Sequence, residues 1–102
     1  MRAIHLVEAD KRRPALLLTR QPTADRLETV VVALITSRVR DLPTEIPVGP
    51  ANGIDRESVV NCDLVRHVRR ADLGPRIGWF PDTREPELRR AIVAAFEQLE
   101  GR

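Results

Sequence analysis

The sequence predicts an α+β domain that is mainly β, with short strands curled into a small barrel-like sheet and one helix at the C-terminus. Two observations predict this fold class. Positions 30–35 form a run of six apolar, mostly β-branched residues without Gly or Pro, which is typical of a central strand buried on both faces. Apolar residues then recur at helical spacing near the C-terminus, which predicts the helix.

Five strands and a last short extended piece are expected before the helix. The polar residues 8–12 leave only about five residues between the first two strands, which favours a hairpin. Pro14 can open the second strand, and Pro47 makes the fourth an edge strand. Val65–Arg69 can prolong the fifth strand as an edge, and Gln21–Leu27 holds at most one helical turn. The expected segments are Ile4–Val7, Ala15–Arg20, Glu28–Arg38, Thr44–Val48, Ser58–Leu64 and Ile77–Phe80.

The helix is expected over Arg84–Glu100. Asp82 followed three residues later by Glu85 is typical of a capping box at a helix start. Pro86 falls in the first turn, where its missing N–H breaks no hydrogen bond. The apolar residues that should face the core are Leu88, Ile92, Ala95, Phe96 and Leu99.

Length and composition indicate one ordinary globular domain, residues 1–102. Hydrophobic residues make up 42% of the chain and charged residues 31%, which is far from the composition of a disordered tail. No apolar run approaches the roughly 20 residues of a membrane span, and no signal-peptide core precedes the first acidic residues. Cys62 is the single cysteine, so no internal disulfide can form. These features predict a protein of the reducing cytoplasm.

The motifs of metal and nucleotide sites are missing from the sequence. There is no CxxC or HxxxH pair, His5 and His67 lie far apart, and no Gly-rich phosphate loop occurs. We therefore expect neither a metal nor a cofactor. A Cys62–His67 nucleophilic pair is conceivable, but Cys62 shares its strand face with Val60 and Leu64, which favours a buried and inert thiol.

The basic residues are almost all arginine. Lys11 is the single lysine among 17 Lys and Arg residues. A GC-rich genome explains such a bias, and so does phosphate recognition, because guanidinium binds phosphate through two parallel hydrogen bonds. The aromatic residues are Trp79, Phe80 and Phe96, too few for a base-stacking platform.

Thr36 ends the central strand as a hydroxyl, directly before Ser37, Arg38 and Arg40. A polar residue at this place can simply mark the end of a strand. It also places a hydroxyl beside guanidinium groups where the chain must reach the surface. The sequence around Thr36 alone leaves both interpretations open.

The order of the segments carries a resemblance. Arg13 and Pro14 open an aliphatic strand, and a central VVALITSR strand, an LPTEIPV segment and a Gly-containing loop follow. DRESVVNCDLVRHV, a Leu-Gly-x-x-Ile-Gly piece and the final helix complete the set. Along essentially its whole length the chain resembles the MazF/PemK family of toxin endoribonucleases, in particular short members that begin Met-Arg-x-Ile-His.

The resemblance implies a strongly twisted SH3-like barrel of the MazF/PemK/CcdB type and a homodimer with one face that binds single-stranded RNA. It implies a metal-independent, sequence-specific endoribonuclease that cuts messenger, ribosomal or transfer RNA through attack of the 2′-hydroxyl. Such a toxin inhibits translation and growth, and an acidic MazE-like antitoxin segment holds it inactive. No membrane partner is implied.

The resemblance also implies site residues. The family's catalytic Arg precedes the strand-opening Pro and corresponds to Arg13, and its catalytic Thr ends the central strand and corresponds to Thr36. In one branch the Asp of a Cys-Asp pair is the general base and corresponds to Asp63, but that branch's catalytic Arg is replaced here by Asn61. Glu8 and Asp10 are the alternative bases. The family's long Gly-rich loop before Arg-Pro is replaced by the short, Gly-free residues 8–12, which predicts a more open site.

The remaining candidates are contacts to RNA. Such residues position the strand by binding its phosphates, or they instead pair with neighbouring carboxylates such as Asp41, Asp63 or Asp72. The candidate RNA-binding residues are Ser37, Arg38, Arg40, Arg66 and Arg69.

Two other functions stay open at this point. A toxin of the same fold could poison DNA gyrase through protein contacts, but its relatives carry a Trp near the chain end, and Trp79 here precedes the whole helix. A non-catalytic SH3-like adaptor needs an aromatic groove for proline-rich peptides, which a chain without Tyr can hardly build.

Overall fold

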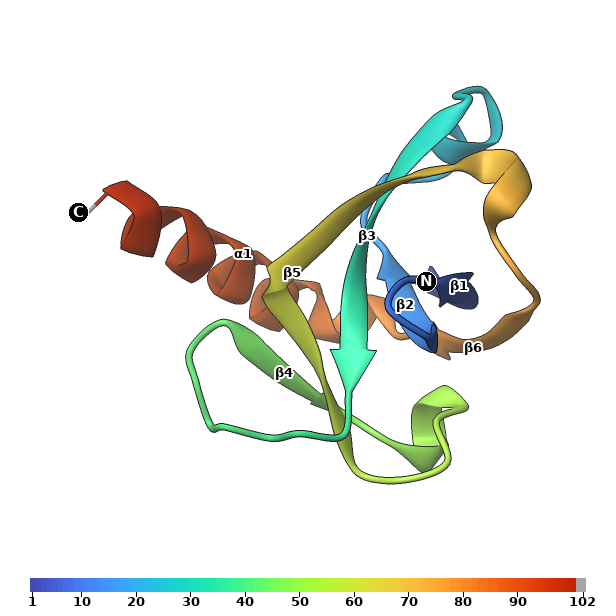
Figure 1. The fold of residues 1–102 in the computed structure, drawn as a ribbon. Helices are drawn as coiled ribbons and strands as arrows, with labels where there is room; N and C mark the ends of the chain where they lie inside the picture. Colours follow the sequence, from blue (N-terminus) through green and yellow to red (C-terminus); the bar gives the residue numbers. More distant parts are fainter. Residues whose placement is uncertain (101–102) are drawn as a thin grey trace.

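The structure, a computed structural model, describes the backbone of residues 1–100 and the side chains of residues 1–97. Six strands are followed by one α-helix within this part of the chain (Figure 1). The last extended piece of the sequence-based prediction is the sixth strand. The elements are β1 (Arg2–Glu8), β2 (Arg12–Leu17), β3 (Thr29–Thr36), β4 (Glu45–Val48), β5 (Ser58–Arg69), β6 (Arg76–Phe80) and α1 (Glu85–Glu100).

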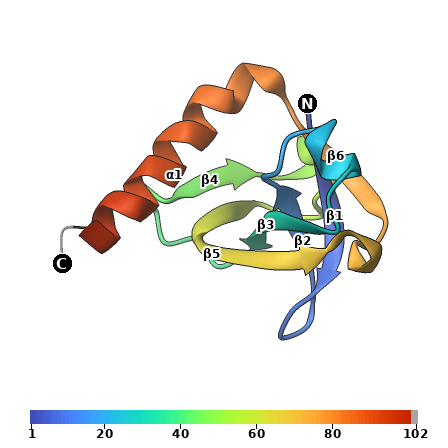
Figure 2. The ribbon, with the colours of Figure 1, turned by 90° about the horizontal axis from the view of Figure 1, so that it is seen from above.

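The six strands form one antiparallel sheet in the order β4-β5-β3-β2-β1-β6. The sheet curls strongly, and α1 lies along β4 (Figures 1 and 2). The edge position predicted for β4 is confirmed. The predicted α+β fold, mainly β with a C-terminal helix, is confirmed as a curled half-barrel.

The first two strands form the predicted hairpin, and both differ from the expected bounds. β2 begins at Arg12, before Pro14, and ends at Leu17 instead of Arg20. Pro14 fits inside the strand because the ladder between β2 and β3 begins only at Ala15, so no partner there requires an N–H from residue 14. The early start brings Arg13 into the strand, opposite Val7 of β1.

β3 is the predicted central strand, with β2 on one side and β5 on the other. Its alternating side chains enter two separate cores. Ala33 and Ile35 pack in the core that lies beneath α1, together with Leu16 and Phe80. The opposite face carries the second core, which contains Val7, Ala15, Leu17, Ala24, Val30, Val32 and Leu34. Burial on both faces explains why the run carries no polar residue until Thr36.

β5 is a single strand that bends sharply in its middle (Figure 1). Ile35 pairs with Val60 but Ala33 pairs with Val65, so β5 contains extra residues at this point and bulges. Beyond the bulge β5 pairs with β3 alone, which confirms that Val65–Arg69 prolongs the strand as an edge. The bend folds this half over the second core, where Val68 packs.

The inner face of α1 is only partly as predicted. Leu88 and Ala95 are buried against the sheet, and Ile92 packs against the same core. The prediction for Phe96 is wrong, because its side chain is 63% exposed and Ala91 is buried instead. The helix therefore packs against the sheet through Leu88 and Ile92 and through the small residues Ala91 and Ala95. The side chain of Leu99 lies outside the described residues.

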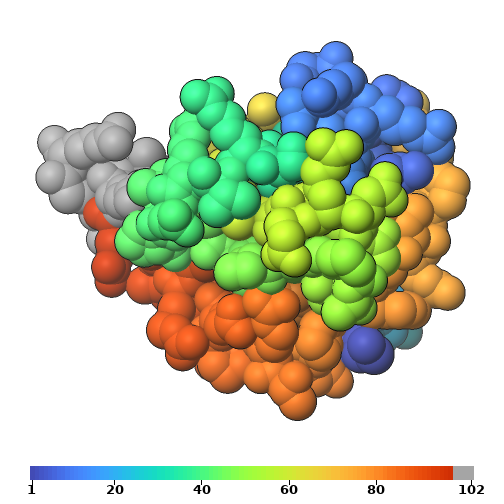
Figure 3. All heavy atoms as spheres, turned by 90° about the horizontal axis from the view of Figure 1, so that it is seen from below, coloured from blue at the N-terminus to red at the C-terminus, as the bar shows by residue number. Residues whose placement is uncertain are grey.

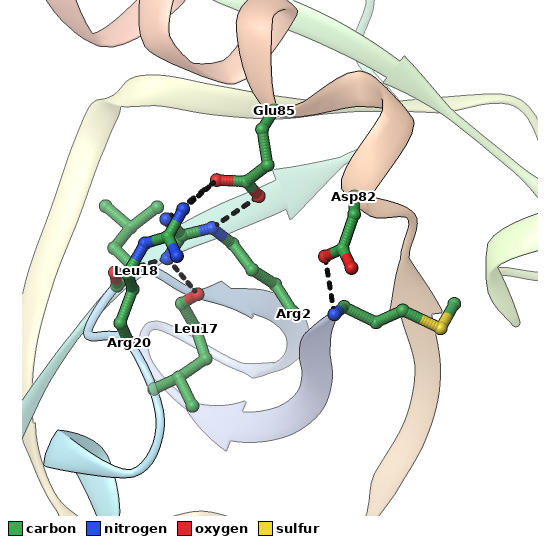
Figure 4. Close-up of polar contacts among 7 residues, drawn as sticks. Arg2, Leu17, Leu18, Arg20, Asp82 and Glu85 are labelled. Atoms are coloured by element: carbon green, nitrogen blue, oxygen red, sulfur yellow. Dashed lines mark hydrogen bonds and ion pairs between the residues drawn. The ribbon is translucent and has the colours of Figure 1, made fainter.

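The start of α1 is held by ion pairs, and the predicted capping box is wrong. Asp82 binds the terminal amine of Met1 at 2.5 Å. Glu85 receives two hydrogen bonds from Arg2, at 2.8 and 3.0 Å, and one from Arg20 at 3.1 Å (Figure 4). Both carboxylates are thus used to fasten the helix to β1 and to the end of β2.

Cys62 lies buried on β5, as expected of an inert thiol. Burial and the neighbouring Asp63 charge raise the pKa of the Cys62 thiol to about 11, so almost no thiolate is present at neutral pH. Among residues 1–97, no helix has the length and hydropathy needed to cross a membrane.

Candidate functional site

The candidate site is a cavity of about 420 Å³ at one end of the sheet, which we call the Arg13 pocket. Most of its lining comes from three segments far apart in the sequence: the turn and start of β2, the end of β3, and the loop between β4 and β5. Leu6 of β1 and Ile77 of β6 complete it. In the space-filling view the three segments (blue, teal and yellow-green) meet on one face of the molecule (Figure 3). The pocket is lined by Leu6, Lys11, Arg12, Arg13, Pro14, Ile35, Thr36, Ser37, Gly53, Ile54, Asp55, Arg56, Ser58 and Ile77.

Two of the three predicted catalytic residues, Arg13 and Thr36, line this pocket. Arg13 is the second residue of β2, and Thr36 is the last residue of β3, where it pairs with Val59 of β5. The two strands are neighbours, and their antiparallel directions bring the start of β2 beside the end of β3. Arg13 near the start of β2 and Thr36 at the end of β3 therefore lie at the same edge of the sheet.

The guanidinium of Arg13 is held by a carboxylate of the hairpin turn. Its Nε donates to Oδ1 of Asp10 at 2.8 Å, and its Nη2 donates to Oδ2 at 3.0 Å. The hydrogen bond from Arg13 holds the pKa of the Asp10 carboxyl well below its usual range and raises the pKa of Arg13. Asp10 is therefore ionised and Arg13 charged at neutral pH.

Thr36 is oriented by the chain that follows it. Its Oγ1 accepts the backbone N–H of Arg38 at 3.2 Å, which leaves its own O–H to donate toward the pocket. Ser37 also lines the pocket. Arg38 and Arg40 are exposed on the segment that leaves it, and the backbone N–H of Arg40 donates to Glu45 at 2.9 Å.

Asp63, the third predicted catalytic residue, does not line the Arg13 pocket. It sits in the bulge of β5, where its backbone N–H donates to Asn61 Oδ1 at 2.9 Å. The hydroxyl of Thr44 donates to its carboxylate at 2.8 Å. The bulge turns Asp63 toward β4, on the other side of β5 from the end of β3. Within one chain the structure does not bring Asp63 to Arg13 and Thr36.

Arg66 and Arg69 lie beyond the bulge, toward the far end of β3. Arg69 pairs in register with Thr29, the first residue of β3, whereas Thr36 is the last. Arg69 donates to Asp72 at 3.1 Å, and Arg66 donates to the backbone carbonyl of Val65 at 3.1 Å. These two arginines therefore lie away from the Arg13 pocket of the same chain.

The sequence analysis missed several lining residues. Arg56 and Asp55 come from the loop between β4 and β5, Lys11 comes from the hairpin turn, and Arg12 is the first residue of β2. Arg12 was visible as half of an Arg-Arg pair, but nothing in the sequence placed residues 53–56 beside β2. Among the side chains of residues 1–97, no group of three His, Cys, Asp or Glu residues could hold a metal ion.

Known proteins match this chain over most of its length. Residues 6–96 match the family described as "PemK-like, MazF-like toxin of type II toxin-antitoxin system". "Endoribonuclease MazF3" of Mycobacterium tuberculosis (strain ATCC 25618 / H37Rv) is 45% identical over 97 residues, covering 95% of this chain and 94% of that protein. "Probable endoribonuclease MazF5" of the same strain is 38% identical over 87 residues, covering 84% of this chain and 76% of that protein.

Solved structures show the same relationship. "Mycobacterium tuberculosis toxin MazF-mt6" superposes with a TM-score of 0.90 at 44% identity and covers 93% of this chain and 96% of its own. "Endoribonuclease in complex with its cognate antitoxin from Mycobacterial species" superposes with a TM-score of 0.81 at 19% identity. The match covers 93% of this chain and 91% of that chain and shows a shared fold. The resemblance drawn from the sequence is confirmed: the chain belongs to the PemK-like, MazF-like toxins of type II toxin–antitoxin systems.

Proposed function

We propose that this toxin is an endoribonuclease and that it cuts single-stranded RNA in the Arg13 pocket. The observation that carries the proposal is the meeting of a fixed guanidinium, Arg13, and an oriented hydroxyl, Thr36, in one open cavity. Membership of a family whose relatives are named endoribonucleases supports the reaction. The surplus of positive charge around the cavity, from Lys11, Arg12 and Arg56, suits a polyanion.

The reaction that these groups fit is transfer of the phosphoryl group to the neighbouring 2′-hydroxyl. The 2′-hydroxyl gives its proton to a base, and the 2′-oxygen forms a bond to phosphorus as the bond from phosphorus to the 5′-oxygen breaks. The leaving 5′-oxygen takes up a proton. The products are a 2′,3′-cyclic phosphate and a 5′-hydroxyl. Negative charge grows on the phosphoryl oxygens during the step, and preorganised donors stabilise it most effectively.

Arg13 and Thr36 supply such donors. Asp10 occupies Nε and Nη2 of Arg13, and Nη1 has no hydrogen-bond partner within residues 1–97, so it can donate to a phosphoryl oxygen. The hydroxyl of Thr36 can donate a hydrogen bond to the phosphate or orient the 2′-hydroxyl. Two fixed donors from two strands thus define where the scissile phosphate sits.

Three carboxylates are candidates for the general base: Asp10, Glu8 and Asp63. Because Arg13 lowers the pKa of Asp10, Asp10 is a weak proton acceptor, and we propose that it orients Arg13. Glu8 is exposed at the end of β1. The assignment of Asp63 as base stays a prediction, which an Asp63→Ala variant assayed with Arg13→Ala alongside will test.

We extend the proposal to partners. The exposed apolar side chains of α1, Val93 at 47% and Phe96 at 63%, favour a homodimer that covers them. A solved relative is an endoribonuclease in complex with its cognate antitoxin, which supports a MazE-like antitoxin here, with acidic residues suited to the basic pocket. We place the toxin in the cytoplasm, where messenger, ribosomal and transfer RNA are its candidate targets and where their cleavage inhibits translation and growth.

The alternative of a gyrase-poisoning toxin has no support. The relatives reported above are described as endoribonucleases or toxins, and none of these descriptions mentions gyrase. An adaptor without chemistry would not need the oriented Arg13 and Thr36.

The decisive experiment is incubation of the purified protein with single-stranded RNA in the presence of EDTA. We expect cleavage that leaves a 2′,3′-cyclic phosphate and a 5′-hydroxyl, identified by end-labelling before and after phosphatase and kinase treatment. Products with a 5′-phosphate, or activity that EDTA abolishes and added metal restores, would contradict the mechanism.

A further inference from the structure

Asp55 is an unexpected residue in the Arg13 pocket. It is the one acidic side chain among the residues that line the cavity, beside Lys11, Arg12, Arg13 and Arg56. Within residues 1–97, no cation lies within ion-pair distance of its carboxylate. An unpaired carboxylate weakens phosphate binding at such a site by repulsion, so its presence needs another reason.

The loop that carries Asp55 is held in place by the buried side chain of Asn52. Its Oδ1 accepts the backbone N–H of Gly49 at 3.1 Å, and its Nδ2 donates to the backbone carbonyl of Trp79 on β6 at 3.0 Å. Asn52 is 6% exposed. One side chain thus closes the loop on itself and fastens it to a neighbouring strand.

Close backbone contact fixes the same loop a second time. Gly53 has a φ of 84°, and a Cβ there would lie 2.1 Å from the carbonyl oxygen of Ile77. A Cβ on Gly78 would lie 1.7 Å from the carbonyl oxygen of Asn52. Only glycine fits at both places. Asp55 therefore stands two residues from a rigid anchor, as a residue that positions a substrate must.

The donors that RNA offers to a carboxylate are its 2′-hydroxyls and the N–H groups of its bases. In single-stranded RNA the Watson–Crick edges of the bases are free to be read by side chains. Guanine alone presents two parallel donors on that edge, N1–H and the N2 amino group, which match the two oxygens of a carboxylate. Phosphates bound by the pocket's cations position the strand, whereas a base contact specifies the sequence.

We propose that Asp55 determines sequence preference by accepting hydrogen bonds from the Watson–Crick edge of a guanine next to the scissile phosphate. The inference rests on the proposed endoribonuclease function of the Arg13 pocket and adds a residue that reads the substrate. Arg56, its neighbour, binds backbone phosphate and carries no sequence information.

The test compares cleavage of a randomised single-stranded RNA library by the wild type, Asp55→Asn and Glu57→Gln. Glu57 is exposed on the same loop and loses the same charge in its variant, but it does not line the Arg13 pocket. Sequencing of the cut ends gives the preference at every position. We expect guanine to be preferred about 10-fold at one position by the wild type and Glu57→Gln, and this preference to be lost in Asp55→Asn.

A defined oligonucleotide then isolates the contact. Inosine replaces that guanine and removes only the N2 amino group. We expect the replacement to slow the wild type several-fold and to leave Asp55→Asn unchanged, because the variant has no carboxylate to leave unpaired. Because Asp55 is exposed, we expect Asp55→Asn to fold with the melting temperature of the wild type, and a thermal melt checks this.

The outcomes separate the two proposals. If the wild type cuts no RNA, or if Arg13→Ala cuts as well as the wild type, the proposed function fails. If the wild type cuts and Asp55→Asn keeps the same preference at every position, the role of Asp55 is refuted while the function stands. A change in overall rate without a change in preference also refutes it.

Discussion

Two arginine–carboxylate pairs of this toxin have the same geometry and different surroundings. Arg2 binds Glu85 through Nε at 2.8 Å and Nη2 at 3.0 Å, and Arg13 binds Asp10 through the same atoms at the same distances. The side chains of the first pair are 14% and 18% exposed, and those of the second are 24% and 66% exposed. The bond lengths alone therefore do not distinguish a structural pair from a functional one.

The remaining donors distinguish them. Nη1 of Arg2 donates to the backbone carbonyl of Leu18 at 2.5 Å and lies 3.5 Å from that of Leu17, so all three nitrogens of the guanidinium are hydrogen-bonded inside the protein (Figure 4). The corresponding nitrogen of Arg13 has no hydrogen-bond partner within residues 1–97, and the Arg13 side chain lines an open cavity. We infer that Arg2 fastens α1 to the sheet and that Arg13 keeps one donor for a ligand.

Replacing each arginine by alanine should have different consequences, and the largest expected effect is the loss of cleavage rate in Arg13→Ala. We expect this variant to lose about 10²–10³-fold in cleavage rate, as when one donor to a developing oxyanion is removed. Its melting temperature should change little, because the pair with Asp10 joins residues three apart on the surface. Single-turnover cleavage of a labelled RNA measures the rate.

Arg13→Lys serves as the matched variant. Lysine keeps the charge but lacks the planar fork that holds Asp10 and a phosphate at once, so we expect only partial recovery of the rate. A rate of Arg13→Ala within about threefold of the wild type would show that the pocket is not the catalytic site.

Arg2→Ala should show the reverse pattern. Removing hydrogen bonds to a charged, half-buried partner leaves Glu85 unpaired and costs about 2 kcal/mol of unfolding free energy. For a chain of this length that lowers the melting temperature by about 8–16 °C. The cleavage rate per folded molecule at 20 °C should equal that of the wild type. A catalytic loss in the folded variant would contradict the separation of the two pairs.

The comparison also explains what the sequence could and could not predict. β3 was recognisable because six apolar residues buried on both faces leave a one-dimensional pattern. Arg13 and Thr36 were found through the family resemblance, and each sits at the end of a recognisable strand. The link from Arg2 to Glu85 spans 83 positions, so no local pattern marks it. The Asp82–Glu85 spacing instead predicted a capping box.

The bulge of β5 and the loop that completes the Arg13 pocket leave no pattern in the sequence. β5 was expected as a strand with an edge extension, but a bulge cannot be read from alternating residues, and the bulge decides that Asp63 faces Thr44. Arg56 and Asp55 join the pocket only because the curled sheet brings the loop after β4 against β2. Phe96 was assigned to the core from helical spacing, which does not reveal where the sheet beneath a helix ends.

Lowering the pH should reduce the stability that the Arg2–Glu85 pair contributes. The hydrogen bond from Arg2 lowers the pKa of Glu85 below its usual 4.5. A carboxyl whose pKa is lowered in the folded state contributes stability that is complete above its unfolded pKa and is lost as pH falls through the folded one. The melting temperature should thus be nearly constant from pH 7 to about 5 and should fall below pH 4.5.

Two variants assign this acid dependence. The melting temperature of Glu85→Gln should be lower than that of the wild type at pH 7, and the two melting temperatures should converge as the pH falls. Asp10→Asn should keep the wild-type dependence, because residues 10 and 13 are close enough to pair in the unfolded chain as well. Thermal melts at six pH values measure both. Equal convergence of Asp10→Asn would show that the hairpin pair carries as much stability as the helix pair.

The smallest expected effect is on the salt dependence of RNA binding, which reports the arginines that contact RNA phosphates around the Arg13 pocket. The sequence suggested Arg38, Arg40, Arg66 and Arg69, whereas the cavity itself includes Arg56. Binding of a substrate that lacks the 2′-hydroxyl at the scissile position should weaken with salt, by a slope of about −0.7 per phosphate neutralised on a single strand. Arg56→Ala should therefore reduce the magnitude of that slope by about 0.7.

Arg69→Ala is the matched control, because Arg69 is paired with Asp72 and lies at the other end of β3 from Thr36. We expect its slope to equal that of the wild type, and the slopes of Arg38→Ala and Arg40→Ala to decide whether the segment after β3 belongs to the groove. Titrations at three salt concentrations resolve one phosphate contact. If Arg69→Ala also reduces the slope, RNA follows β5 beyond its bulge. If Arg56→Ala leaves the salt slope unchanged, the RNA enters the pocket from the hairpin side, past Lys11 and Arg12.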